Sequence, residues 1–190
     1  MMSSLLRFYL ICLCSFFLSY SHASTILVMG DSLSAAYQLP VEKGWVSLLE
    51  SKVKQQNQQI SIINASISGE TTQGGVSRLT SLLDSAPSLV ILELGANDAL
   101  RGYPLKTTKQ NLIKMVQISK EAGAKVLLIG NQIPPNYGRR YASAFFTLYQ
   151  DIAQQEEVSL VPFMLDNVAL NQDLMLNDGL HPNAQGQTIV

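Results

Sequence analysis

The feature that most constrains the fold is a regular alternation of short apolar runs with longer amphipathic stretches. The apolar runs cover residues 25–29, 60–65, 89–94, 125–129 and 158–161. The stretches between them place apolar side chains at helical spacing over residues 41–55, 73–83, 107–121 and 141–156. Apolar strands that alternate with helices indicate a parallel sheet covered on both faces. The chain is therefore predicted to be an α/β protein with right-handed crossovers.

The first 23 residues are typical of a secretory signal peptide. Arg7 supplies the positive charge, residues 8–18 form the apolar core, and residues 21–23 give a small-x-small pattern before Ser24. This apolar core is shorter than the roughly 20 residues that span a bilayer, and an uncleaved anchor is the alternative. We expect residues 1–23 to be removed, residues 24–190 to form one domain, and the product to be periplasmic, with secretion as the alternative.

Composition and charge narrow the choice of partners. Both cysteines, Cys12 and Cys14, lie in the predicted signal peptide, so the mature chain is expected to have no disulfide. Arg7 is the only cation in that segment, and its loss changes the net charge from −1 to −2. No long run of like charges favours nucleic acid or a membrane surface. We expect a monomer that binds no nucleic acid and does not insert stably into a membrane after cleavage.

Four polar clusters mark the candidate site. They are expected to follow the ends of predicted strands, and they lie at residues 30–32, 66–70, 95–98 and 178–181. In parallel α/β sheets, ligands bind beyond the carboxyl ends of the strands. We therefore expect the four clusters to meet at one edge of the sheet.

Ser32 is the candidate nucleophile. It follows Gly30 and Asp31 at what is predicted to be a strand-to-helix turn, where glycine permits a sharp bend and a helix N-terminus favours negative charge. A serine that only caps a helix is the alternative interpretation. The chain has no G-x-S-x-G motif, so the nucleophile elbow of the α/β-hydrolases is absent.

His181 is the candidate base, because no other histidine occurs after residue 22. A serine hydroxyl is a weak nucleophile unless a neighbouring base removes its proton. Asp178 lies three positions before His181, where it is expected to orient the ring and stabilise the imidazolium. The alternative is an ordinary histidine in a loop or in the core.

Gly69 and Asn97 are candidate donors to an oxyanion. The backbone amides of Ser32 and Gly69 and the side-chain amide of Asn97 are the groups expected to bind the oxygen of a tetrahedral intermediate. Taken singly, Gly69 and Asn97 are also ordinary turn residues. Asp31 and Glu93 allow a paired-carboxylate glycosidase as an alternative, but that mechanism leaves His181 without a role.

No cofactor is expected. A single histidine without cysteine in the mature chain does not make a transition-metal cluster. The sequence contains no P-loop and no dinucleotide-binding fingerprint.

Together the four clusters resemble those of the SGNH, or GDSL, hydrolase superfamily. Ser32, Gly69, Asn97 and His181 match the four residues that name it, and Asp178 matches the aspartate of its last block. The likeness runs from Thr25 to the C-terminus, and it is most similar to the periplasmic, multifunctional arylesterases, thioesterases and lysophospholipases of bacteria. It implies a flavodoxin-like, three-layer α/β/α sandwich around five parallel strands. It also implies a full C-terminal helix. We therefore expect the helix-like residues 183–190 to be a truncated form of that helix.

The resemblance implies a serine ester hydrolase that acts through an acyl-enzyme on small acyl esters, thioesters or lysophospholipids. The alternatives are a short-chain or carbohydrate acetylesterase of the same superfamily, and a non-catalytic binding protein on a hydrolase-like fold. Residues 100–105 and 133–137, with Phe145 and Phe146, are expected to shape the acyl pocket, although both phenylalanines also suit the core. The expected substrate contacts are Asp31, Asp98, Leu100, Tyr103, Pro134 and Tyr137. Of these, Asp98 also suits a role in orienting a neighbouring loop.

Overall fold

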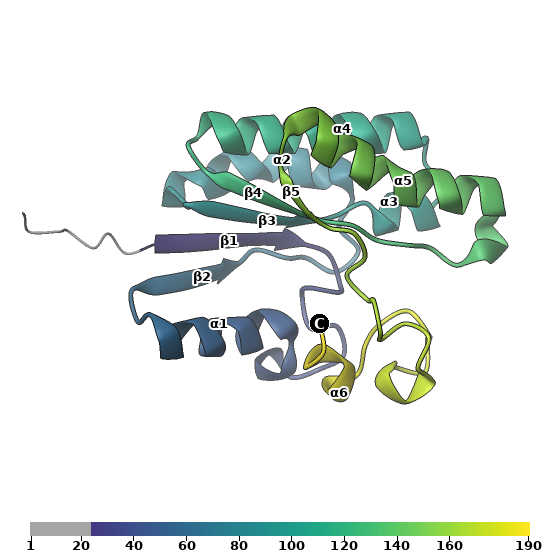
Figure 1. Ribbon diagram of the computed structural model, residues 1–190, viewed down its shortest axis with the longest axis horizontal. Coiled ribbons are helices and arrows are strands. Elements are labelled where there is room, and N and C mark those ends of the chain that lie inside the picture. The colour runs from purple at the N-terminus through teal and green to yellow at the C-terminus, as the bar shows by residue number, and fades with distance from the viewer. Residues whose placement is uncertain (1–23) are drawn as a thin grey trace, which may run out of the picture.

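The structure, a computed structural model, describes residues 24–190. The predicted signal peptide at residues 1–23 therefore lies outside the described residues. The described residues form three layers, in which a twisted sheet carries helices on both faces (Figure 1).

The central sheet has five parallel strands in the order β2-β1-β3-β4-β5. The strands are β1 (Ser24–Gly30), β2 (Ile60–Asn64), β3 (Leu89–Glu93), β4 (Lys125–Ile129) and β5 (Ser159–Val161). This order is the flavodoxin-like one, and it confirms the predicted fold class. The direction of winding reverses between β1 and β3, which is where ligands bind in such sheets. Gly30 pairs with Glu93 in the β1–β3 register, so these two strands end level with each other.

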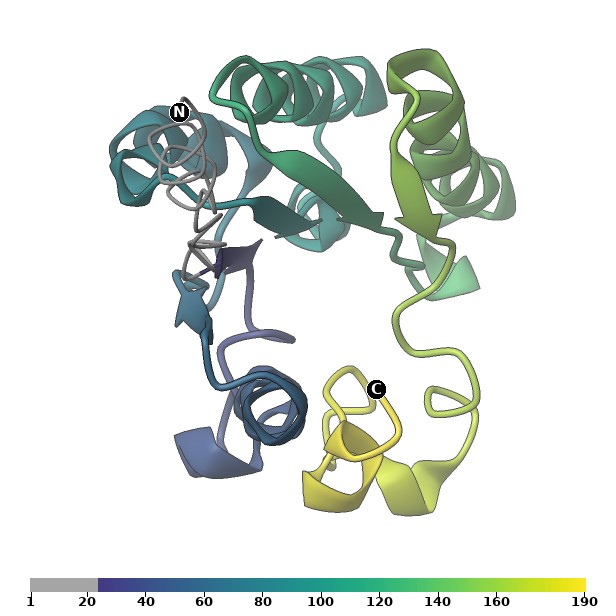
Figure 2. The ribbon, with the colours of Figure 1, turned by 60° about the vertical axis from the view of Figure 1, so that its left-hand side comes forward.

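The helices divide between the two faces of the sheet (Figure 1). One face carries α2, α3, α4 and α5, which are Thr72–Leu82, Ala96–Leu100, Leu105–Glu121 and Arg139–Glu156. The other face carries α1 (Trp45–Gln56) and the C-terminal segment with α6 (Ala184–Gln187). Figure 2 shows this C-terminal segment beside α1, on the side of the sheet opposite to α4 and α5.

Two hydrophobic cores lie on the two faces, because successive side chains of a strand point to opposite sides. Leu27, Met29 and Leu92 pack with residues of α2, α4 and α5. Val28 and Ile91 pack instead with Trp45 and with residues of the C-terminal segment. The expected burial on both faces therefore holds for the central strands. At the two edges of the sheet, Ile63 of β2 and Val161 of β5 are each 37% exposed.

Several boundaries differ from those predicted. Residues 41–55 divide into a short 3₁₀ turn (Val41–Lys43) and α1, because Gly44 between them is extended. The five-residue α3 was not predicted, since it is too short to show a periodic pattern. Phe145 is fully buried and packs edge-to-face on Tyr149, with ring centroids 5.3 Å apart. Phe145 therefore belongs to the core, the interpretation that the sequence favours for this side chain taken singly, and it does not line an acyl pocket.

The remaining connections include three further 3₁₀ turns, Leu83–Ser85, Pro135–Tyr137 and Gln172–Leu174. Among residues 24–190, none of the helices combines the length and the apolar character needed to cross a membrane.

Candidate active site

Ser32, His181 and Asp178 form a continuous hydrogen-bonded series. The distance from His181 Nε2 to Ser32 Oγ is 2.8 Å, and the distance from His181 Nδ1 to Asp178 Oδ2 is 2.7 Å. A carboxylate only accepts hydrogen bonds, so Nδ1 carries the proton and Nε2 is left to accept the Ser32 hydroxyl. The structure thus brings together the three residues that the sequence singled out, although Ser32 and His181 lie 149 positions apart.

A tight turn orients the His181 ring. Asp178 Oδ1 accepts hydrogen bonds from the backbone N–H groups of Leu180 and His181, at 2.9 and 3.1 Å. The Leu176 N–H donates to the His181 carbonyl at 2.7 Å. The ring of Tyr37 lies against the His181 ring, with centroids 4.4 Å apart and planes inclined by 34°. The His181 ring is therefore held in place by hydrogen bonds to the backbone of its turn, by the hydrogen bond from Nδ1 to Asp178, and by the Tyr37 ring against its face.

The surroundings of Asp178 keep it ionised. Partial burial favours the neutral acid, but the backbone hydrogen bond from Leu180 and the hydrogen bonds and charge of His181 outweigh it and lower the pKa of Asp178 below its usual value. A carboxylate at this position stabilises an imidazolium on His181.

Ser32 lies on an irregular turn and not at a helix N-terminus, so the predicted strand-to-helix turn is wrong. The Ser34 and Ala35 N–H groups donate to the Asp31 carbonyl, and the Tyr37 N–H donates to the Ser32 carbonyl. The next α-helix begins only at Trp45. The turn residues Ala36 and Gln38 adopt positive φ angles of 56°, which delays the start of a helix.

The loop after β2 presents Gly69 beside the end of β1. Gly69 has a φ of +80°, a left-handed conformation that glycine adopts without strain. The Ile67 N–H donates to the Gly30 carbonyl, and the Gly30 N–H donates to Ser66 Oγ, both at 3.1 Å. Neither the Gly69 N–H nor the Ser32 N–H donates a hydrogen bond within residues 24–190. Both amides are consequently available to a ligand.

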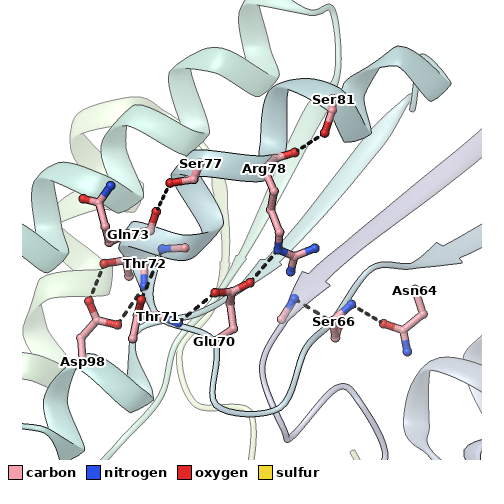
Figure 3. Close-up of polar contacts among 12 residues, drawn as sticks. Asn64, Ser66, Glu70, Thr71, Thr72, Gln73, Ser77, Arg78, Ser81 and Asp98 are labelled. Atoms are coloured by element: carbon pink, nitrogen blue, oxygen red, sulfur yellow. Dashed lines mark hydrogen bonds and ion pairs between the residues drawn. The ribbon is translucent and has the colours of Figure 1, made fainter.

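Asp98 joins the neighbouring helix α3 to the start of α2 (Figure 3). Its carboxylate is buried and accepts from the Thr72 N–H at 2.9 Å and from the Thr72 hydroxyl at 2.5 Å. Glu70, on the same loop, forms an ion pair with Arg78, with Oε2 and Nε 2.6 Å apart. Arg101 Nη2 donates to the Gly69 carbonyl at 3.0 Å. Asp98 thus holds the loop that carries Gly69. It does not line the cavity of about 220 Å³ beside Ser32, where a substrate contact was expected.

Asp31 and Glu93 form a buried acidic pair beside Ser32. The Asp31 carboxylate accepts from the Leu33 N–H and from Asn97 Nδ2, both at 3.0 Å. Asn97 has a second amide hydrogen that remains free to face a substrate. Burial raises the pKa of Asp31 from 3.8 to about 6, against the opposing effect of these hydrogen bonds and of His181. Burial and the nearby charge of Asp31 also raise the pKa of Glu93 well above its usual value.

A cavity of about 220 Å³ opens beside Ser32 and His181. Of the expected substrate contacts, Asp31, Leu100 and Pro134 line it, whereas Tyr103 and Tyr137 lie outside it and are each 44% exposed. Ile133 also lines it, as expected of residues 133–137, and Ala96 and Leu180 belong to two of the four polar clusters. The lining residues outside every predicted segment are Leu33, Asn131, Gln132 and Leu165. Their positions depend on how distant loops pack, and no short motif marks them. Among residues 24–190, no group of three or more metal-binding side chains occurs.

A serine, a histidine and an aspartate in this series, at the carboxyl edge of an α/β sheet, define a serine hydrolase. The sequence matches the GDSL-like lipase/acylhydrolase family over residues 28–189. It is 47% identical to an arylesterase of Vibrio mimicus over 163 residues, which are 85% of this chain and 82% of that protein.

Two further relatives agree with that match. Over 169 residues the chain is 42% identical to the thioesterase 1/protease 1/lysophospholipase L1 of Escherichia coli, covering 88% of this chain and 80% of that one. The crystal structure of TesA superposes with a TM-score of 0.84 at 47% identity, over 87% of this chain and 93% of that one. The protein belongs to the GDSL-like lipase/acylhydrolase family, and it is an enzyme that hydrolyses ester bonds.

The raised pKa of Asp31 predicts how stability changes with pH. Because the folded-state pKa is higher than that of the unfolded chain, the folded protein holds the extra proton between pH 3.8 and about 6. The contribution of Asp31 to the free energy of unfolding is therefore most favourable below pH 3.8 and is lost as the pH rises to about 6. This loss amounts to roughly 3 kcal/mol, because one pKa unit corresponds to about 1.4 kcal/mol.

We expect the stability of the wild type, relative to Asp31→Asn, to fall across that pH range. Urea unfolding of both proteins at intervals between pH 4 and pH 7 measures the difference. Asp84→Asn, which removes an exposed carboxyl group, is the matched control and should follow the wild type closely. A constant difference between the wild type and Asp31→Asn would contradict the account.

Proposed function

We propose that the enzyme hydrolyses acyl esters and thioesters through a covalent acyl-enzyme on Ser32. The observation that carries this proposal is the hydrogen-bonded series from Ser32 through His181 to Asp178. His181 Nε2 takes the hydroxyl proton as Ser32 Oγ bonds to the carbonyl carbon, and the carbonyl electron pair moves onto oxygen. Collapse of this intermediate expels the alcohol or thiol, which receives the proton from His181. Water, deprotonated by the same nitrogen, then releases the acid and restores Ser32.

The oxyanion binds three N–H groups in this proposal. They are the free backbone amides of Ser32 and Gly69 and the second amide hydrogen of Asn97. Donors that are fixed before the reaction stabilise the charge that develops on oxygen, and the loss of one such donor costs about 10²–10³ in kcat. Gly69 is held by Arg101 and Asn97 by Asp31, so both positions are set by the fold.

Replacing the nucleophile tests the mechanism directly. We expect Ser32→Ala to lose nearly all hydrolysis of p-nitrophenyl esters, because within residues 24–190 no other hydroxyl forms a hydrogen bond with the His181 ring. The variant should also fail to be labelled by a fluorophosphonate, as read by intact-protein mass spectrometry. Ser51→Ala, which removes a remote exposed hydroxyl, should retain both properties. More than a few per cent of residual activity in Ser32→Ala would refute the assignment.

We propose that the acyl group lies in the cavity beside Ser32. Leu100, Ile133, Pro134 and Leu180 supply apolar walls there, and an apolar pocket favours a hydrocarbon chain over a sugar. Lysophospholipids and other small esters fit this description.

Acyl-chain length separates this substrate class from the acetylesterase alternative. We expect kcat/KM for p-nitrophenyl esters to increase from acetate to chains of several carbons, and lysophosphatidylcholine to release fatty acid. Acetylated sugars should be poor substrates. A maximum at acetate, together with release of acetate from acetylated sugars, would favour the short-chain alternative instead.

We propose that the enzyme is exported to the periplasm. The support is the signal-peptide pattern of residues 1–23, with its charged start, apolar core and small residues before Ser24. Expression of the full chain in a Gram-negative host should give a periplasmic protein whose N-terminal residue is Ser24, as read by N-terminal sequencing. A protein that retains Met1 and stays in the cytoplasmic fraction would contradict this proposal.

A further inference from the structure

Glu93 is a fully buried carboxylate that has no place in the proton transfers described above. It lies at the end of β3, beneath the turn that carries Ser32, and it does not line the substrate cavity. No lysine, arginine or histidine of residues 24–190 forms an ion pair with it. Burying a carboxylate without a cation is costly unless hydrogen-bond donors surround it. The arrangement of its donors therefore indicates what the residue does.

One oxygen of Glu93 holds the nucleophile turn on both sides of Ser32. Glu93 Oε2 accepts the Asp31 N–H at 3.2 Å and the Ser34 hydroxyl at 2.8 Å. Gly30 leaves the room that this carboxylate needs, since a Cβ there would lie 2.7 Å from Oε2 and 2.6 Å from Ser34 Oγ. The Glu93 side chain thus links the turn after β1 to the end of β3, where the backbone hydrogen bonds between these two strands have ended.

The other oxygen of Glu93 is fixed from β4. Asn131 follows β4, is 1% exposed, and donates from Nδ2 to Glu93 Oε1 at 2.7 Å. With both oxygens engaged, the carboxylate cannot rotate without losing a buried hydrogen bond. Glu93 therefore joins the ends of β1, β3 and β4 at a single buried point.

Glu93 is also linked to Asn97, because both residues form a hydrogen bond with Asp31. The backbone N–H of Asp31 donates to Glu93, and the side chain of Asp31 accepts from Asn97 Nδ2 at 3.0 Å. A shift of the Asp31 backbone would therefore move both the Ser32 amide, which is the next residue, and the Asn97 amide. Two of the three proposed oxyanion donors depend on this one carboxylate.

We propose that Glu93 is a positioning residue for ester hydrolysis, acting with Asn131 and Ser34 to hold Ser32 and Asn97 in the geometry of the oxyanion site. This inference rests on the proposed function of Ser32. Because the donors bind the oxyanion more strongly than the neutral carbonyl, their misplacement lowers kcat and leaves KM nearly unchanged.

The first test is Glu93→Gln, which keeps the shape but replaces one acceptor oxygen by an amide donor. Whichever way the new amide turns, its N–H₂ group faces the N–H of Asp31 and the Ser34 hydroxyl, or the amide of Asn131. We expect kcat on a p-nitrophenyl ester to fall by about 10–100-fold, the scale of a small misplacement of reacting groups, with KM changed less than about 3-fold.

The second test is rescue. In the double variant Glu93→Gln with Asn131→Asp, the new amide donates to the new carboxylate while its oxygen still accepts from Asp31 and Ser34. We expect kcat to return to within several-fold of the wild type, whereas Asn131→Asp alone, which places two carboxylates together, should be impaired. Glu93→Gln combined with Asn97→Ala should lose less than the product of the two single losses, because both act on Asn97.

Circular dichroism shows whether Glu93→Gln folds. Ser34→Ala provides a second test if it does not. It removes one donor to Oε2 and should lower kcat about 3–10-fold at constant KM, on the same misplacement scale. Wild-type kcat in folded Glu93→Gln, or in Ser34→Ala when Glu93→Gln does not fold, would overturn the proposal. So would absence of rescue by the double variant. An active Ser32→Ala, in contrast, would overturn the proposed function itself, so the two failures are distinguishable.

Discussion

The hydrogen bond between Ser32 and His181 is the contact on which the site depends, because it joins two segments 149 positions apart in the chain. The C-terminal segment that carries His181 is held against the sheet by the second hydrophobic core. Met164, Leu165 and Val168 pack there with Trp45 and with strand residues of β1 and β3. The backbone N–H of Trp45 also donates to Gln187 Oε1 at 2.8 Å. Packing of this segment therefore also places His181, and mutations in this core should affect both stability and the position of His181.

The parallel sheet supplies the other half of the geometry. Because β1 and β3 end level with each other, Ser32 and Asn97 leave neighbouring strands at the same edge. The loop after β2 reaches this edge through its hydrogen bonds to Gly30. Beyond the ends of the strands, hydrogen bonds to buried side chains fix the positions of the loops. Asp98 binds the start of α2, while Glu93 binds the turn after β1. The sheet brings the loops of the site to the same edge, and these two carboxylates fix the positions of their backbones.

The sequence predicts the sheet and the main candidate residues well, for physical reasons. Buried parallel strands leave apolar runs, and residues such as Ser32, Gly69 and Asn97 follow those runs directly. His181 was identifiable because no other histidine occurs after residue 22.

Other parts were not predictable because they depend on tertiary packing. Tyr37 lies on the His181 ring because an irregular turn carries it there, before the stretch 41–55 that was predicted to be helical. Asn131 meets Glu93 where the neighbouring strands β4 and β3 end, and Asp98 is buried where it binds Thr72 at the start of α2. Phe145, which the sequence allowed as a pocket residue or a core residue, lies in the core because α5 turns that face inward.

In the proposed mechanism, Ser32 forms the covalent intermediate while fixed N–H groups bind the oxyanion. A crystal structure of the enzyme after reaction with an alkyl fluorophosphonate tests it most directly, because the tetrahedral adduct reproduces the geometry of the intermediate. We expect phosphorus bonded to Ser32 Oγ, with the phosphonyl oxygen about 2.7–3.1 Å from the amides of Ser32, Gly69 and Asn97. An adduct on another residue, or a phosphonyl oxygen that faces solvent away from these amides, would contradict it.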